Sequence, residues 1–260
     1  MNHFLCSSLL LLAPLSAGPA PALRPQEETP PEDKRAVVAE LIQRLHDHAG
    51  ARGKEDQEAV GVIGELVVEF PRSGPRDRKA IVKALDKCFE EKRGEQDGEL
   101  QNQLYLGAAE ALGGMAPESV DVLIGWIGHK AHRDDVTLQR RLIRMLGKTK
   151  SEDGRRPLIK LLTHRDALIQ SAAAEALGDY EDAEQDARKE CFEELLKELM
   201  TVKGQKDSDP NDTIARDRWD VIAAPIVSSL GRLSRHQELT PEDWQRWYNK
   251  NRREDWDEPR

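Results

Sequence analysis

The chain has 260 residues, of which 38% are hydrophobic and 33% are charged, and its formal net charge at pH 7 is -9. This length is enough for a sizeable hydrophobic core, and interspersed charges of both signs indicate solvated helix faces rather than disorder. The acidic balance argues against a surface for nucleic acid or anionic membrane, which would need clustered Lys and Arg.

The N-terminal segment has the features of a cleaved secretory signal. An apolar run from Leu5 to Leu15 is followed by small residues, and the first charged residue is Arg24. The run is shorter than the ~20 apolar residues of a membrane span, and Ala20-Pro21-Ala22 fits a cleavage site. We therefore expect a signal peptide over residues 1–22 and a secreted or periplasmic protein without a membrane span after cleavage. The alternative is an uncleaved anchor, since no Lys or Arg precedes the run.

After the signal, the composition changes twice. Residues 23–31 are rich in Pro and Glu and are expected to form a disordered linker. From there to residue 260, apolar residues at helical spacing predict one helical domain. The predicted helices cover 31–50, 60–70, 75–89, 99–112 and 117–127, followed by a helix that ends at 147 and a helical hairpin over 153–182.

The hairpin over 153–182 shows the pattern most clearly. Ile169, Ala173, Ala174 and Leu177 share one side of its second helix, and Gly178 follows. Glycine adopts the left-handed conformation easily, so Gly178 is expected to terminate this helix. Such a hairpin has more apolar surface than it can bury alone, which predicts neighbours of the same shape.

Those neighbours are visible as a repeat. The sequence from Ala108 to Gly113 recurs letter for letter from Ala173 to Gly178, and related segments end at Gly147 and Gly231. The first three glycines stand at intervals in the thirties, which is typical of an α-solenoid with two helices in each unit. The longer interval before Gly231 contains residues 202–212, whose Lys, Gly, Asp and Pro predict a loop insertion. Pro225 is expected to kink or restart the helix that ends near Gly231.

These motifs resemble the HEAT-like repeats, including those named after phycobilisome lyases. The resemblance rests on Leu-Ile-x-x-Leu, a polar turn with Asp, and then Ala-Ala-x-Ala-Leu-Gly, and it is best over 117–182. It implies an all-α, armadillo-like solenoid of about five antiparallel hairpins in a right-handed superhelix. The sequence departs from the family where a basic residue is usual early in the second helix, since that site holds Tyr105, Gln139, Gln170 and Ala223.

The C-terminal segment 240–260 is predicted to cap the solenoid. Thr240-Pro241-Glu242-Asp243 is a strong helix start, and Trp244, Trp247 and Tyr248 then share one face. A terminal unit of a solenoid needs one buried face and one solvated face. The alternative is that these aromatic residues form a docking patch.

No motif predicts catalysis. His129 and His132 could share a helix face, but zinc needs three or four placed ligands, so we expect a solvated turn. Residues 207–218 begin like a calcium loop but have Asp212 and Arg218 where glycine and glutamate are required. There is no phosphate-binding glycine loop and no nucleophile elbow. Cys88 and Cys191 lie in apolar patterns and are expected to be buried and free rather than paired.

We therefore expect no catalytic, cofactor-binding or metal-binding residues. The candidate partner-binding residues are Glu110, Arg140, Arg144 and Glu175, which recur off the apolar stripe of successive second helices. They form either a stripe for a partner or salt bridges between repeats. The sequence predicts a non-enzymatic, exported scaffold that binds another protein and no nucleic acid. The alternative, allowed by the resemblance, is a lyase-like or regulatory subunit of an enzyme complex.

Overall fold

The computed structural model describes residues 33–96 and 99–257, which belong to one compact unit, Pro31–Arg260. The predicted signal peptide at 1–22 and linker at 23–31 lie outside the described residues. Within the described residues, no helix is both long enough and apolar enough to cross a membrane.

The described residues are almost entirely helical, as expected. The α-helices are α1 (Ala36–Ala49), α2 (Asp56–Glu69), α3 (Pro75–Cys88), α4 (Gln103–Leu112), α5 (Val120–Trp126), α6 (Val136–Lys148), α7 (Glu152–Leu161), α8 (Ala167–Gly178), α9 (Gln185–Ser208), α10 (Thr213–Ser234) and α11 (Pro241–Asn251). Two 3-10 turns, η1 (Phe70–Arg72) and η2 (Asp179–Asp182), and a short antiparallel pair, β1 (Glu95–Gln96) with β2 (Glu99–Leu100), complete the elements.

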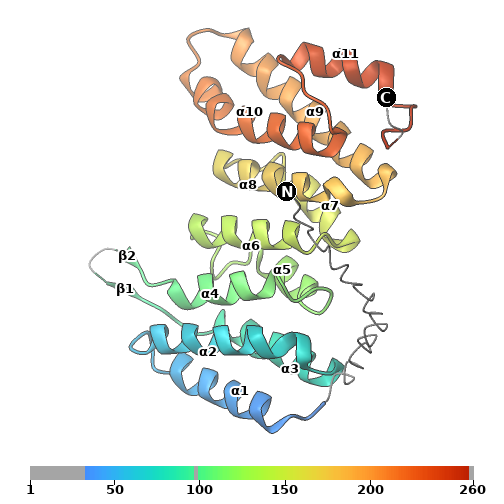
Figure 1. Ribbon diagram of the computed structural model, residues 1–260. Helices are drawn as coiled ribbons and strands as arrows, with labels where there is room; N and C mark the ends of the chain where they lie inside the picture. Colours follow the sequence, from blue (N-terminus) through green and yellow to red (C-terminus); the bar gives the residue numbers. More distant parts are fainter. Residues whose placement is uncertain (1–32, 97–98, 258–260) are drawn as a thin grey trace, which may run out of the picture. The chain divides into compact units, whose positions relative to one another are not determined.

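Successive helices pair into hairpins that stack on one another (Figure 1). The pairs are α1 with α2, α3 with α4, α5 with α6, α7 with α8, and α9 with α10. Each even-numbered helix from α2 to α10 also contacts the next even-numbered helix, so these helices form one continuous layer. This arrangement confirms the predicted α-solenoid.

Each hairpin buries its apolar stripe against the next hairpin. Ile169, Ala173, Ala174 and Leu177 of α8 are all buried, as are the equivalent residues Leu138, Leu142 and Leu146 of α6. Cys88 and Cys191 are free and buried in the same core, where burial raises the pKa of each thiol to about 12. The two thiols are therefore protonated and unreactive at neutral pH.

The recurring glycines have a different role from the predicted one. Helix α8 ends at Gly178 as expected, but Gly178 keeps an ordinary right-handed helical conformation with φ -62°, so the expected left-handed conformation is wrong. Gly147 lies inside α6, one residue before its end. A Cβ atom on Gly147 would lie 2.7 Å from Cα of Ala176, and one on Gly178 would lie 2.5 Å from Oγ of Ser229. At Gly113, Gly147 and Gly178 the next helix of the even-numbered layer approaches too closely for a side chain, whereas at Gly231 the obstacle is Gln237 after α10.

Several predicted boundaries are also wrong. Residues 99–100 pair as strand β2, and α4 begins only at Gln103. The predicted loop at 202–212 is mostly helix, because α9 continues to Ser208 and buries Val202. Val202 follows Leu199 at helical spacing, and both side chains are buried. This packing outweighs the loop-forming residues that follow Val202. Helix α10 runs through Pro225 as one element, so of the two predicted outcomes the restart is wrong and the kink stays a prediction.

The C-terminal helix is the predicted cap. Oγ1 of Thr240 accepts a hydrogen bond from the backbone N–H of Asp243, which fixes the start of α11. Trp244, Trp247 and Tyr248 are buried, and their rings lie 5.7, 5.5 and 5.2 Å from that of Phe192 on α9. Because these rings pack against Phe192 and are buried, they do not form the exposed docking patch that was the alternative prediction.

Candidate functional site

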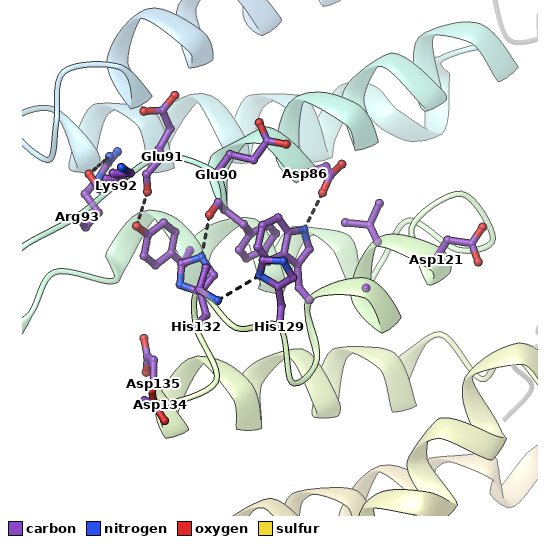
Figure 2. Close-up of a pocket in the computed structure, with 16 residues that line it drawn as sticks. Asp86, Glu90, Glu91, Lys92, Arg93, Asp121, His129, His132, Asp134 and Asp135 are labelled. Atoms are coloured by element: carbon purple, nitrogen blue, oxygen red, sulfur yellow. Dashed lines mark hydrogen bonds between the residues drawn. The ribbon is translucent and has the colours of Figure 1, made fainter.

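A groove of about 1190 Å³ lies between the second and third hairpins (Figure 2). We call it the aromatic groove. One wall is the end of α3 with the segment 89–93, and the other is α5 with the segment 127–135. It is lined by Asp86, Phe89, Glu90, Glu91, Lys92, Arg93, Tyr105, Asp121, Val122, Gly125, Trp126, His129, Ala131, His132, Asp134 and Asp135.

Two side chains from the even-numbered layer hold the walls in place. The hydroxyl of Tyr105 on α4 donates to the backbone carbonyl of Glu91 in the first wall. Nε2 of Gln139 on α6 donates to the carbonyls of Trp126 and His132, at 3.3 and 3.2 Å, in the second wall. Both residues occupy the site where the sequence departs from the usual basic residue. There they add side-chain donors to turn carbonyls, two of which, those of Trp126 and His132, also accept from the backbone N–H groups of His129 and Asp135.

A buried ion pair fixes the first wall at its other end. Nη2 of Arg93 lies 2.8 Å from Oδ1 of Asp56 on α2, and it also donates to the carbonyl of Ala49 at 2.7 Å. Both side chains of the pair are almost completely buried. Breaking such a pair leaves an uncompensated buried charge, so the position of Arg93 is strongly determined.

The floor of the groove is a cluster of aromatic rings. Phe89, Tyr105 and His132 are buried, whereas Trp126 and His129 are half-buried. The ring of Trp126 lies 5.2 Å from that of Phe89 and 4.5 Å from that of His129. Burial raises the pKa of the Tyr105 phenol above its ordinary value. The cluster is therefore a rigid apolar surface that presents Trp126 and His129 to solvent.

His132 does not lie in a solvated turn, so that prediction is wrong. Its side chain is buried, and Nε2 donates to the carbonyl of Phe89 at 2.7 Å. A carbonyl oxygen only accepts, so Nε2 carries the proton. Among the residues that the structure describes, no group of three or more His, Cys, Asp and Glu is arranged to hold a metal ion.

Carboxylates surround the rings. Figure 2 shows Asp86, Glu90, Asp121, Asp134 and Asp135 on several sides of the cluster. Oδ1 of Asp86 accepts a hydrogen bond from Nε1 of Trp126 at 2.7 Å, which fixes the plane of the indole. Asp135 caps α6 by accepting from the N–H of Leu138 at 3.0 Å. The groove thus combines an aromatic floor with an acidic rim.

The predicted partner-binding residues lie elsewhere, along the even-numbered layer. Glu110 on α4 is paired with Lys148, at 3.1 Å, and with Arg141, both on α6. Arg144 on α6 is paired with Glu175 on α8 at 2.8 Å. Three of the four predicted residues therefore form ion pairs between adjacent repeats.

The same ladder continues to α10, where Arg232 pairs with Asp179 and Glu181 at 2.9 and 3.0 Å. The Arg232 guanidinium holds the pKa of Glu181 below its ordinary value. Arg140 does not join this ladder and makes no ion pair with a described residue. The structure brings Arg141 to Glu110 in its place.

The comparison with known families agrees with this architecture. Residues 130–198, which extend from the end of the aromatic groove through α6, α7 and α8 into α9, match the family model of HEAT repeats. This segment is built of HEAT repeats. No curated protein matches the chain.

The HEAT repeats explain which parts of the site the sequence revealed. The match supports the HEAT-like family and does not distinguish the phycobilisome-lyase type of repeat. The inter-repeat ion pairs follow the repeat register, so sequence reasoning found Glu110, Arg144 and Glu175 but not Arg141 or Lys148. The aromatic groove was missed, because Phe89 and Tyr105 come from the second hairpin and Trp126 from the third. The signal in the sequence was the helical spacing of Trp126 with His129, three residues apart.

Proposed function

We propose that this protein is an exported, non-catalytic scaffold that binds another protein through the aromatic groove. HEAT repeats and other solenoids commonly provide extended surfaces for partners. The observation that carries the choice of surface is the half-buried pair Trp126 and His129, held in a concavity that no described side chain fills. Tryptophan is the residue most enriched at the centres of protein interfaces, where a pocket excludes water around it.

The ion-pair ladder is the weaker candidate for the same function. Arg144 and Glu175 already pair with each other across the repeats, and Glu110 pairs with Arg141 and Lys148. A partner that used these charges would have to replace existing ion pairs, each worth less than ~1 kcal/mol at a surface. A stripe centred on Arg140 and Arg144 stays a prediction, and charge reversal of both arginines tests it.

The test of the groove uses two glycines that both have room for a side chain. Gly125 on α5 lines the groove and Gly64 on α2 lies outside it, and no atom lies within 4 Å of a Cβ placed on either. Both positions therefore accept a Cβ, so Gly125→Phe introduces a ring at the groove and Gly64→Phe is its matched control. Circular dichroism should show that both variants remain folded.

Affinity capture from the native envelope fraction, followed by mass spectrometry, then compares the two variants with the wild type. We expect the wild type and Gly64→Phe to retain the same partner and Gly125→Phe to lose it. Retention of the partner by Gly125→Phe would refute the groove as the binding surface. Loss with Gly64→Phe alone would move the interface to α2.

Export is the other half of the proposal. It is supported by the apolar run from Leu5 to Leu15 and the small residues after it. Cell fractionation with mass spectrometry of the mature N-terminus tests it. We expect an envelope or extracellular product that begins near residue 23, and a cytosolic product that still carries residues 1–22 would contradict it.

A further inference from the structure

We propose that the partner segment held by the aromatic groove is basic, with one Lys or Arg side chain seated over the indole of Trp126. This inference rests on the proposed function, because it names the chemical class of the partner for the same groove. It follows from the negative charge of the rim, from the lack of ion-pair partners for its most exposed carboxylates, and from the surroundings of Trp126.

The rim is strongly acidic. Six carboxylates line the groove, from Asp86, Glu90, Glu91, Asp121, Asp134 and Asp135, and only two cationic side chains, from Lys92 and Arg93. Arg93 is committed to its buried ion pair with Asp56, so it does not neutralise the rim. A cleft lined by one sign of charge raises the local concentration of ligands of the opposite sign. The groove therefore attracts cations and repels acidic segments and nucleic acid.

The most exposed rim carboxylates are available to a ligand. Glu90 and Asp121 are exposed, and neither makes an ion pair with a described residue. Asp134 has only a loose, exposed contact of 3.6 Å with Arg133. A basic side chain can therefore reach these carboxylates without breaking an existing pair, in contrast to the ladder on the even-numbered layer.

Trp126 supplies the seat for the cation. A cation over the face of an aromatic ring is attracted by the ring quadrupole, and tryptophan is the best ring for it. The carboxylate of Asp86 accepts from the indole N–H at 2.7 Å, which adds a negative charge at the edge of the ring. Gly125 precedes Trp126 and has no side chain, and a Cβ there would meet nothing within 4 Å. That open space accommodates the apolar stem of a Lys or Arg side chain.

The test measures binding of a fluorescein-labelled hexalysine peptide by fluorescence anisotropy at about 0.1 M salt, where the Debye length is about 10 Å. The comparison probe is the same peptide with every lysine acetylated, which keeps the stems and removes the charge. We expect hexalysine to bind the wild type at least about tenfold more tightly than the acetylated peptide, since both the cation–π attraction and the ion pairs need the charge.

Variants locate the binding. Gly125→Phe should weaken hexalysine binding at least about tenfold by filling the seat, whereas Gly64→Phe should leave it within about twofold. The double variant Glu90→Gln with Asp121→Asn should weaken binding about fivefold. Its matched control, Glu58→Gln with Asp220→Asn, removes the same charge from exposed carboxylates outside the groove and should have no effect.

Each outcome has a separate meaning. Equal binding of the acetylated peptide, or equal weakening by the groove variant and its charge-matched control, would overturn the basic class of partner. If hexalysine fails but Gly125→Phe still loses the captured partner, the groove stands as the binding surface and only its cationic specificity is wrong. If Gly125→Phe changes neither measurement, the proposed function fails as well.

Discussion

Alanine at position 147 tests why glycine recurs in the stacked helices. A Cβ atom on Gly147 would lie 2.7 Å from both Cα and Cβ of Ala176 and 2.8 Å from its backbone oxygen. Ordinary carbon contacts are about 3.5–4.0 Å, so α6 and α8 would have to separate by roughly 0.8 Å or more. The obstacle is backbone, which cannot rotate away as a flexible side chain would.

The expected cost follows from two opposing effects. Overpacking a close-packed interface costs about 1–3 kcal/mol and occasionally more, and a backbone obstacle belongs at the upper end. Replacing glycine by alanine inside a helix stabilises it by up to about 1 kcal/mol. We therefore expect Gly147→Ala to lower the free energy of unfolding by about 2 kcal/mol.

Urea unfolding followed by circular dichroism measures this change. Gly64→Ala is the control, because Gly64 is exposed on α2 and a Cβ there meets nothing within 4 Å. It should be neutral or stabilise the protein by up to about 1 kcal/mol. If Gly147→Ala proves as stable as the wild type, close approach of α6 and α8 is not the reason for the glycine.

Three further predictions concern polar contacts. Asp257→Ala removes the carboxylate that lies 2.8 Å from the buried guanidinium of Arg188. Urea unfolding should show that the free energy of unfolding falls by about 2 kcal/mol, less than the full cost of breaking a buried pair because Asp257 is half exposed. An unchanged unfolding midpoint would contradict this. Burial raises the pKa of Glu198, so the native state holds its proton more tightly than the unfolded state and wild-type stability is lost as pH rises through that pKa. Glu198→Gln should flatten this dependence above about pH 4, and an identical pH profile would refute the assignment. A double-mutant cycle of Arg144→Ala and Glu175→Ala should give a coupling below ~1 kcal/mol, because both side chains are about two-fifths exposed, and a much larger value would mean that the ladder holds the repeats together.

The helical layers were predictable because their signal is local. The spacing of Ile169, Ala173 and Leu177 places them on one helix face wherever the chain folds, and all three are buried. The identical segments ending at Gly113 and Gly178 predicted equivalent positions in the stack, and both glycines lie at the ends of even-numbered helices. A regular pattern over neighbouring residues is enough to find such elements.

What the sequence did not reveal depends on contacts between distant residues. The role of Gly147 is set by Ala176 on α8, the next helix of the even-numbered layer, and nothing within α6 distinguishes a close approach from a helix end. The aromatic groove is also a tertiary feature, because Tyr105 on α4 reaches the carbonyl of Glu91 and His132 reaches that of Phe89. Pairing of repeats determines which rings meet, and no single stretch of sequence records it.

The most direct test of the account follows the indole N–H of Trp126 by NMR while the captured partner is added. The chain has five tryptophans, so their indole signals are few, and Trp126→Phe assigns the one in the groove. We expect the Trp126 signal to shift or broaden on binding, while those of Trp244 and Trp256, buried in the C-terminal cap, stay in place. An unmoved Trp126 signal in a saturated complex would show that the partner binds elsewhere and would contradict the account.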